Sequence, residues 1–244
     1  MPRFFVPSDN FSDGSVAITG DDAFHIARSL RMAEGDTVTV CDMHGCEHTC
    51  TLTRIRDDEC ICRITESKAG DTEPPVHITL YMAYPKGDKL EVVVQKAVEL
   101  GAARIVPFES SRCIKRPSAD KADKNTARLS RIAEEAAKQC GRSILPEVCR
   151  PVGFKDALSA AAKADLPLFC YEGDGTRSLK AILEEAKGAK TVSVVVGCEG
   201  GFSAAEADDA RAQGFNMANL GKRILRCETA PSFALSAICY FFEL

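Results

Sequence analysis

A glycine-rich segment after a run of β-branched residues is the strongest candidate binding site. Residues 192–196 read VSVVV and lead into GCEGGFS, whose glycines are Gly197, Gly200 and Gly201. Such glycines let backbone N–H groups approach a ligand, and Ser203 with Glu206 forms a capping box for a following helix. The spacing matches neither the dinucleotide fingerprint nor the P-loop. Glu199 would repel a phosphate, so a neutral or cationic ligand fits better; the alternative is a plain strand-to-helix turn.

A second candidate turn, NLGKRILRCETAP at residues 219–231, follows about twenty residues later along the chain. Lys222, Arg223 and Arg226 come after a Leu-Gly pair, and Pro231 suits the first position of a final helix. In open α/β sheets ligands bind at the carboxyl ends of the strands, where both turns would lie. The two turns therefore predict one shared pocket. The alternative is a solvated edge on which the arginines alternate with apolar residues.

Two features concentrate positive charge. Residues 110–125, SSRCIKRPSADKADKN, hold five basic and two acidic side chains, and further arginines lie near the N-terminus. The candidate contacts to RNA phosphates are Arg3, Arg28, Arg31, Arg112, Lys115 and Arg116. A merely solvated loop is the alternative for residues 110–125.

A polar stripe is expected on a helix at residues 127–142. Its members, spaced by four, four and three, are Arg131, Glu135, Gln139 and Arg142. This spacing places them on one side of a helix, where Gln139 and Arg142 could contact a nucleotide. The alternative is an exposed ion pair between Arg131 and Glu135.

The elements that must position these residues divide at a polar segment that ends in two prolines, so we expect a linker at 71–75. Before it, strand-like runs at 37–41, 46–55 and 60–64 and a short helix at 22–31 predict a small antiparallel β domain, residues 1–70. After it, strands alternate with helices, which predicts an α/β domain with a largely parallel sheet, residues 76–244.

Expected strands of the second domain lie at 76–83, 104–108, 168–171 and 191–196, and expected helices at 88–101, 127–142, 179–187, 204–213 and 231–242. The segment 88–101 contains three consecutive valines, which favour a strand. Its ends favour a helix, because Asp88 and Glu91 form a capping-box pattern and Gly101 suits the position after a helix. Apolar residues also recur there at helical spacing.

Composition excludes several classes. The 244 residues are 45% hydrophobic and 27% charged, as in globular proteins and unlike disordered or collagen-like chains. The longest apolar stretch, 233–242, is too short to span a bilayer, and the N-terminus lacks the apolar core of a signal peptide. We therefore expect a cytoplasmic protein that has reduced thiols and no membrane partner. The formal net charge of −4 gives no whole-molecule argument for nucleic acid.

The twelve cysteines include a dense group between Cys41 and Cys62, with His44 and His48 among them. The group contains no CxxC pair, and its spacing alternates as in a strand. Buried structural thiols are the preferred interpretation and a metal site is the alternative. We expect no metal.

Five stretches together resemble the 16S ribosomal RNA uridine N3-methyltransferases of the SPOUT class along nearly the whole chain. They are RFFV, KGDKLEVVVQKAVELGAARIVPF, EEAAKQCGRSILPEV, VGCEGGFSAAE and LGKRILRCETA. One departure is visible, because the glycine loop of this family usually reads GPEGG and Cys198 here replaces the proline.

The resemblance implies a PUA-like β-barrel for docking on RNA, followed by an α/β domain tied in a trefoil knot. It also implies S-adenosylmethionine as cofactor, a homodimer with active sites at the subunit interface, and 16S rRNA or the small ribosomal subunit as partner. The implied cofactor-binding residues are Cys170, Tyr171, Glu172, Gly197, Glu199, Gly200, Gly201, Leu220, Gly221, Arg223, Ile224 and Leu225.

For catalysis, the resemblance implies direct methyl transfer to N3 of uracil, and an arginine would stabilise the anion formed when N3 loses its proton. The candidate cations are Arg226 and, from the second subunit, Arg142, and Glu199 is a weaker candidate base. The main rival is a non-catalytic RNA-binding or ribosome-assembly protein that retains the fold. A nucleotide enzyme of the doubly wound type is disfavoured because the phosphate signature is absent.

Overall fold

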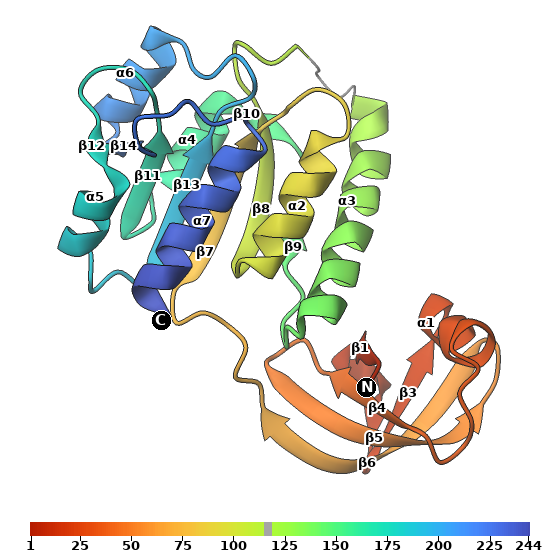
Figure 1. The fold of residues 1–244 in the computed structure, drawn as a ribbon. Helices are drawn as coiled ribbons and strands as arrows, with labels where there is room; N and C mark the ends of the chain where they lie inside the picture. Colours follow the sequence, from red (N-terminus) through yellow and green to blue (C-terminus); the bar gives the residue numbers. More distant parts are fainter. Residues whose placement is uncertain (115–118) are drawn as a thin grey trace. The chain divides into compact units, whose positions relative to one another are not determined.

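The computed structural model describes residues 1–114 and 119–244, which form two compact units (Figure 1). The first unit comprises Met1–Glu73 with Ala137–Leu145, and the second comprises Pro74–Ala136 with Pro146–Leu244. The division between Glu73 and Pro74 falls within the expected linker. Residues 137–145, which the sequence assigned to the second domain, instead pack with the first unit.

The first unit is built on a sheet with the strand order β1-β4-β5-β6-β3-β2. The strands are β1 (Arg3–Phe5), β2 (Phe11–Ser12), β3 (Ser15–Thr19), β4 (Thr37–Cys41), β5 (Cys46–Ile55) and β6 (Glu59–Ala69). β1 pairs in parallel with β4, and the other neighbours are antiparallel. A short helix α1 (Asp21–Phe24) continues into a π-helical turn (His25–Ser29), and a 3-10 turn spans Ser8–Asn10.

Cysteines form part of the apolar core of the first unit. Cys50, Cys60 and Cys62 pack there with the side chains of Phe4 and Ile18. Side chains alternate between the faces of a strand, so the alternating cysteine spacing puts these thiols on the inner face. Burial raises the pKa of Cys50 to about 11 and that of Cys62 to about 12, so both thiols are protonated near neutral pH.

The segment Ala137–Leu145, which belongs to the first unit, contains the last residues of α3 (Ala119–Cys140) and the chain that follows this helix. Gly141, at φ +82°, ends the helix in a conformation that glycine adopts readily, so Arg142 lies beyond it. The backbone N–H groups of Gly141 and Arg142 both donate to the carbonyl oxygen of Ala137. The prediction that Arg142 shares one helix face with Arg131, Glu135 and Gln139 is therefore wrong, because Arg142 is not on the helix.

A parallel sheet forms the centre of the second unit, in the order β10-β8-β7-β13-β11-β14-β12, with β9 pairing with β8. The strands are β7 (His77–Ala83), β8 (Ala102–Glu109), β9 (Glu147–Val148), β10 (Val152–Gly153), β11 (Leu166–Cys170), β12 (Arg177–Ser178), β13 (Thr191–Val196) and β14 (Asn216–Asn219). Every strand pair is parallel. The carboxyl ends of β11, β13 and β14 consequently meet at one edge.

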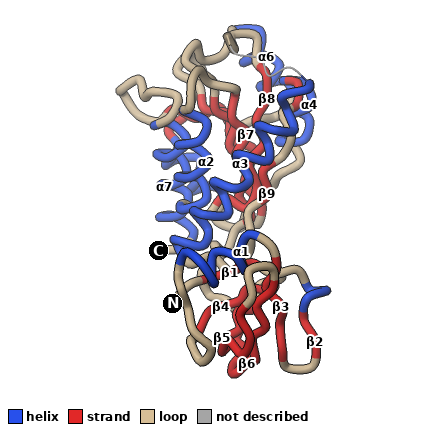
Figure 2. Tube along the Cα trace, turned by 90° about the vertical axis from the view of Figure 1, so that its right-hand side faces the viewer, coloured by secondary structure: helices blue, strands red, loops and turns tan. Residues whose placement is uncertain are grey.

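Helices cover both faces of this sheet. They are α2 (Lys89–Glu99), the first part of α3, α4 (Phe154–Ala161), α5 (Leu179–Glu185), α6 (Ala204–Ala212) and α7 (Thr229–Phe242). α2 and α7 lie on one face, whereas α4 and α6 lie on the other (Figures 1 and 2). The central strands are largely apolar, as expected for a parallel sheet covered on both sides; Leu80, Leu168 and Val194 have no exposed surface. No helix among the described residues is long and apolar enough to cross a membrane.

Segment 88–101 is a helix, as its ends indicated. Asp88 precedes the first helical residue, and Gly101 follows the helix at φ +81°. The expected capping box is absent, however: the side chain of Asp88 makes no cap hydrogen bond, and the carboxylate of Glu91 instead pairs with Arg128 at 2.9 Å. Sequence also missed α4, which begins at Phe154 without a side-chain cap.

Candidate functional site

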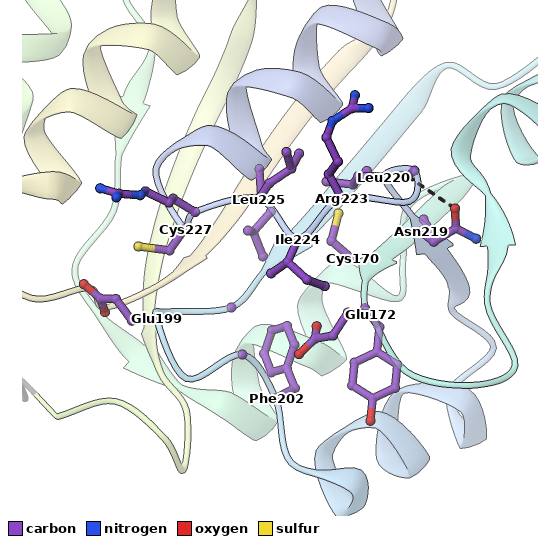
Figure 3. A pocket seen from close by; sticks show the side chains of 18 of the residues that line it. Cys170, Glu172, Glu199, Phe202, Asn219, Leu220, Arg223, Ile224, Leu225 and Cys227 are labelled. Atoms are coloured by element: carbon purple, nitrogen blue, oxygen red, sulfur yellow. Dashed lines mark hydrogen bonds between the residues drawn. The ribbon is translucent and has the colours of Figure 1, made fainter.

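A pocket of about 830 Å³ opens where β11, β13 and β14 end (Figure 3). Its walls are the turns that follow these three strands, together with the N-terminal residues of α2 and α7. The first turn supplies residues 170–172, the second residues 196–199, 201 and 202, and the third residues 218–227. The two turns singled out from the sequence thus face one cavity, at the sheet edge where open α/β folds bind ligands.

The glycine loop after β13 turns back sharply on itself. The N–H of Gly201 donates to the carbonyl of Cys198 at 2.9 Å, and Gly201 has φ +60°. A Cβ added to Gly197 would lie 3.1 Å from the backbone of Gly201, so a larger residue would fit only if the loop shifted slightly, and glycine suits this close approach. Ser203 and Glu206 then form the expected capping box at the start of α6.

The turn after β11 brings a carboxylate to the glycine loop. A Cβ added to Gly201 would lie 2.8 Å from Glu172 Oε1, so the carboxylate of Glu172 rests against that glycine. Figure 3 shows Glu172, Phe202 and Ile224 converging on the middle of the pocket. Within the described part of the chain, the carboxylate of Glu172 forms no ion pair, which leaves it available to a ligand.

The third turn leads from β14 to α7. Gly221 has φ +103°, and its N–H donates to Asn219 Oδ1 at 3.4 Å. Ile224 is 82% exposed at the pocket, an uncommon position for a large apolar side chain. The carbonyl of Arg226 accepts hydrogen bonds from the backbone N–H groups of Thr229 and Ala230, which starts the final helix.

Opposite charges connect the glycine loop with α2 and α7. Lys89 Nζ lies 3.0 Å from Glu199 Oε1 and 3.4 Å from Glu228 Oε2. The backbone N–H of Lys86 also donates to Glu199 at 3.1 Å. Partial burial would raise the pKa of Glu199, but the hydrogen bonds from Lys89 and from backbone N–H groups together hold that pKa below its ordinary value.

Cys227 lies beside this charged group and lines the pocket. Burial raises the pKa of the Cys227 thiol to about 12, and the neighbouring carboxylate of Glu228 contributes to the shift. The thiol is therefore protonated near neutral pH, where it would be a poor nucleophile.

Of the expected cofactor-binding residues, all except Gly200 line the pocket. Glu199 and Arg226 line it as well. Arg142 does not: its side chain is buried in the first unit, where it forms an ion pair with Glu73. The same carboxylate accepts from the backbone N–H groups of Ser143 and Ile144, so the guanidinium takes part in a structural contact of the first unit.

The expected RNA-binding residues differ in environment. Arg3 is mostly buried and pairs with Glu47 at 2.7 Å, so it supports the β domain from within. Arg28 is exposed but paired with Asp57 at 2.6 Å, and Arg31 is exposed. Arg112 donates to a carbonyl of the glycine loop. Lys115 and Arg116 lie outside the described residues.

Lys89 was not expected from the sequence to be a pocket residue. Phe202 and Asn219 also line the pocket; both lie within the two candidate turns but were not among the expected cofactor-binding residues. Lys89 is the first residue of α2, directly after the KGD stretch. A cation at a helix N-terminus interacts unfavourably with the helix dipole, so its position there could have indicated a functional role. Among the described residues no group of three or more His, Cys, Asp or Glu side chains could hold a metal ion.

The fold and the pocket define an α/β protein with a ligand site at the carboxyl edge of a parallel sheet, preceded by a small β domain. Residues 72–239 match the RNA methyltransferase domain, and residues 18–65 match the RNA methyltransferase PUA domain. The chain belongs to this RNA methyltransferase family.

The similarity to known proteins extends along nearly the whole length of this chain. The chain is 35% identical over 232 residues to a ribosomal RNA small subunit methyltransferase E of Bacillus subtilis, covering 93% of this chain and 91% of the relative. It is 31% identical to the enzyme of that name from Synechocystis, over 99% of this chain and 78% of the relative. The structure of a ribosomal RNA small subunit methyltransferase E from Neisseria gonorrhoeae bound to S-adenosyl methionine is 32% identical, with a TM-score of 0.89 and coverage of 99% and 98%.

Proposed function

We propose that this protein transfers a methyl group from S-adenosylmethionine to N3 of a uridine in the RNA of the small ribosomal subunit, in the cytoplasm. The observation that carries the proposal is the pocket of three turns at the carboxyl edge of the sheet, in a chain of the RNA methyltransferase family. The small-subunit methyltransferase relatives support the choice of RNA.

The residues of the pocket suit this cofactor. Its volume lies within the roughly 300–1,000 Å³ typical of small-molecule sites. Glycines expose backbone groups that can hydrogen-bond to adenine or to the amino acid moiety, and Phe202 and Ile224 supply apolar surface. The carboxylate of Glu172, which has no ion-pair partner among the described residues, favours a ligand that carries hydroxyl groups or positive charge over a phosphate.

When bound, S-adenosylmethionine supplies a methyl group on a positively charged sulfur. Neutral uracil carries a proton on N3, and that proton must pass to solvent water as the N3–methyl bond replaces the sulfur–methyl bond. The site must therefore favour the anion, whose charge spreads over O2 and O4. Arg226 is exposed at the pocket and forms no ion pair with another described residue, so its guanidinium is free to face those oxygens. Glu199 is a poor base because it is ion-paired and its pKa is lowered, so we assign it to holding the loop.

The test combines calorimetry, methyl transfer and one variant. We expect S-adenosylmethionine to bind the purified protein and N3-methyluridine to disappear from the ribosomal RNA of cells lacking the gene. Arg226→Ala should lower the methyl-transfer rate by about 100-fold while changing cofactor affinity less than about twofold. Arg131→Ala, which removes an exposed arginine of α3, is the matched control.

Absence of binding heat in the wild-type protein would favour the rival non-catalytic RNA-binding or ribosome-assembly protein. Unchanged turnover in Arg226→Ala would remove this residue from the mechanism while leaving the activity itself intact.

We further propose a homodimer. The exposed face of α7 carries large apolar side chains, among them Phe233 (43% exposed) and Tyr240 (74%), and such a surface is typical of subunit contacts. The trefoil knot stays a prediction from the resemblance.

A further inference from the structure

The segment that follows β8, residues 110–113, contacts the glycine loop and the start of α6 at several points. From its charge, this segment was expected to contact RNA. In the structure, polar groups of Ser110, Ser111 and Arg112 contact neighbouring protein atoms.

The first contact is made by Arg112. Its Nη1 donates to the carbonyl oxygen of Gly200 at 2.8 Å. A Cβ added to Gly200 would lie 3.1 Å from Arg112 Cβ, so the aliphatic stem packs directly against this glycine. Together the two contacts hold the peptide between Gly200 and Gly201 in one orientation, and Gly201 lines the pocket.

The second contact runs through Glu206, which is only 6% exposed. Its Oε1 accepts from the backbone N–H of Ser111 at 2.7 Å, and its Oε2 accepts from that of Ser203 at 2.8 Å. Burial would raise the pKa of Glu206, but the N–H groups of Ser111 and Ser203 together lower it, so the carboxylate is ionised near neutral pH. One charged group thus joins the segment to the end of the glycine loop.

The third contact is a buried cluster behind the loop. Ser110 Oγ lies 3.3 Å from Cys113 Sγ and 4.0 Å from Cys198 Sγ, and all three side chains are at most 6% exposed. Cys198 is the second residue of the glycine loop, so this packing fixes the loop from its inner side.

We infer that Arg112 is a positioning residue, which orients the Gly200 peptide for cofactor binding rather than contacting RNA. The inference rests on the proposed function, because it names the residue that shapes the proposed cofactor site. A guanidinium that donates to a carbonyl and packs along its stem holds a peptide plane more firmly than a solvated side chain does.

The experiment measures two affinities in the same variants. S-adenosylmethionine binding without RNA is followed by calorimetry, and RNA binding by fluorescence anisotropy at several salt concentrations. Arg112→Met keeps the apolar stem and removes the donor, so it should weaken cofactor binding roughly tenfold. Arg112→Lys retains one donor and should recover most of that loss. RNA affinity and its salt dependence should change little in either variant.

Arg131→Ala, which removes an exposed arginine of α3 outside the pocket lining, should leave cofactor affinity unchanged. Thermal denaturation of each variant checks that it is folded. If Arg112→Met unfolds, Arg112→Leu, which also removes the donor, replaces it, and an unchanged cofactor affinity in folded Arg112→Leu overturns the inference. An unchanged cofactor affinity in folded Arg112→Met also overturns it, and a salt slope reduced by about one would then assign Arg112 to a phosphate contact. Failure of the wild-type protein to bind S-adenosylmethionine would instead overturn the proposed function itself.

Discussion

At the scale of single residues, the pocket depends on side chains that act through one another. Lys89 stands between the carboxylates of Glu199 and Glu228, which come from the glycine loop and from the residue before α7. Its own pKa is raised, first by the hydrogen bond to Glu199. A single ammonium group therefore holds two pocket segments that would otherwise repel each other.

This arrangement predicts a pH dependence. The pKa of Glu199 is lowered in the folded protein, so its contribution to loop stability is present above the ordinary carboxyl range and is lost as the pH falls through that lowered pKa. In Lys89→Met the pKa of Glu199 should rise, because partial burial remains without the cation. Loss of S-adenosylmethionine affinity on acidification should then begin at a higher pH than in the wild type.

Calorimetric titrations between about pH 4 and about pH 7 would measure the shift. Lys89→Arg should restore the wild-type profile. Because Glu228 shares the same ammonium, Glu199→Gln in the Lys89→Met background separates the two carboxylates. Identical acid profiles for wild type and Lys89→Met would refute the pairing.

At the scale of elements, the start of α6 is where local sequence and tertiary structure agree. Ser203 and Glu206 form the capping box that their spacing indicated, whereas the similar pattern at Asp88 and Glu91 does not form one. The difference is the neighbour: Glu206 gains a further donor in the N–H of Ser111, whereas Glu91 pairs outward with Arg128. A capping-box pattern in the sequence shows which side chains could cap a helix. It does not show which hydrogen-bond partner each of these side chains meets in the folded protein.

Removing the carboxylate should therefore destabilise the domain. Glu206→Ala removes hydrogen bonds to the N–H groups of Ser111 and Ser203, and we expect the free energy of unfolding to fall by about 2 kcal/mol. Asp209→Ala, an exposed acidic position on the same helix, should change it by less than about 0.5 kcal/mol. Urea denaturation provides both values; equal effects in the two variants would show that the buried carboxylate has no special role.

The sequence predicted the helices and strands better than it predicted the contacts between distant residues. Strand ends, the glycine loop and the helix end at Gly101 follow from local chemistry, so they could be expected from residue type and spacing. Arg142 was misplaced because its spacing suggested a helix face, although Gly141 ends the helix one residue earlier. The ion pair of Lys89 with Glu199 and the hydrogen bond from Arg112 to Gly200 each join residues far apart in the sequence. Such contacts cannot be predicted from the periodicity of the sequence.

At the scale of the whole molecule, local charge distribution matters more than net charge. The chain is acidic overall, yet it belongs to an RNA methyltransferase family. Three of the arginines expected to bind RNA, Arg3, Arg28 and Arg112, have protein partners. Arg31 is exposed and forms no ion pair with another described residue. Fewer of the described arginines than the sequence suggested are therefore without a protein partner.

The proposed dimer gives the last prediction, and it follows from α7. Phe233 (43% exposed) and Tyr240 (74%) are seven residues apart on one face of the helix that begins at the pocket. Phe233 is in the first turns of this helix, so burial of the whole face by a second copy would bring a subunit boundary near the site. Tyr240→Lys places a charge on that face and should shift the protein from dimer to monomer in light scattering after gel filtration, because an unpaired buried charge is costly. Phe24→Lys, which replaces an exposed aromatic of the first unit, is the control and should remain dimeric. If the Tyr240→Lys monomer methylates RNA at the wild-type rate, the second copy contributes nothing to the site. If the wild-type protein is monomeric at micromolar concentration, the proposal of a dimer is wrong.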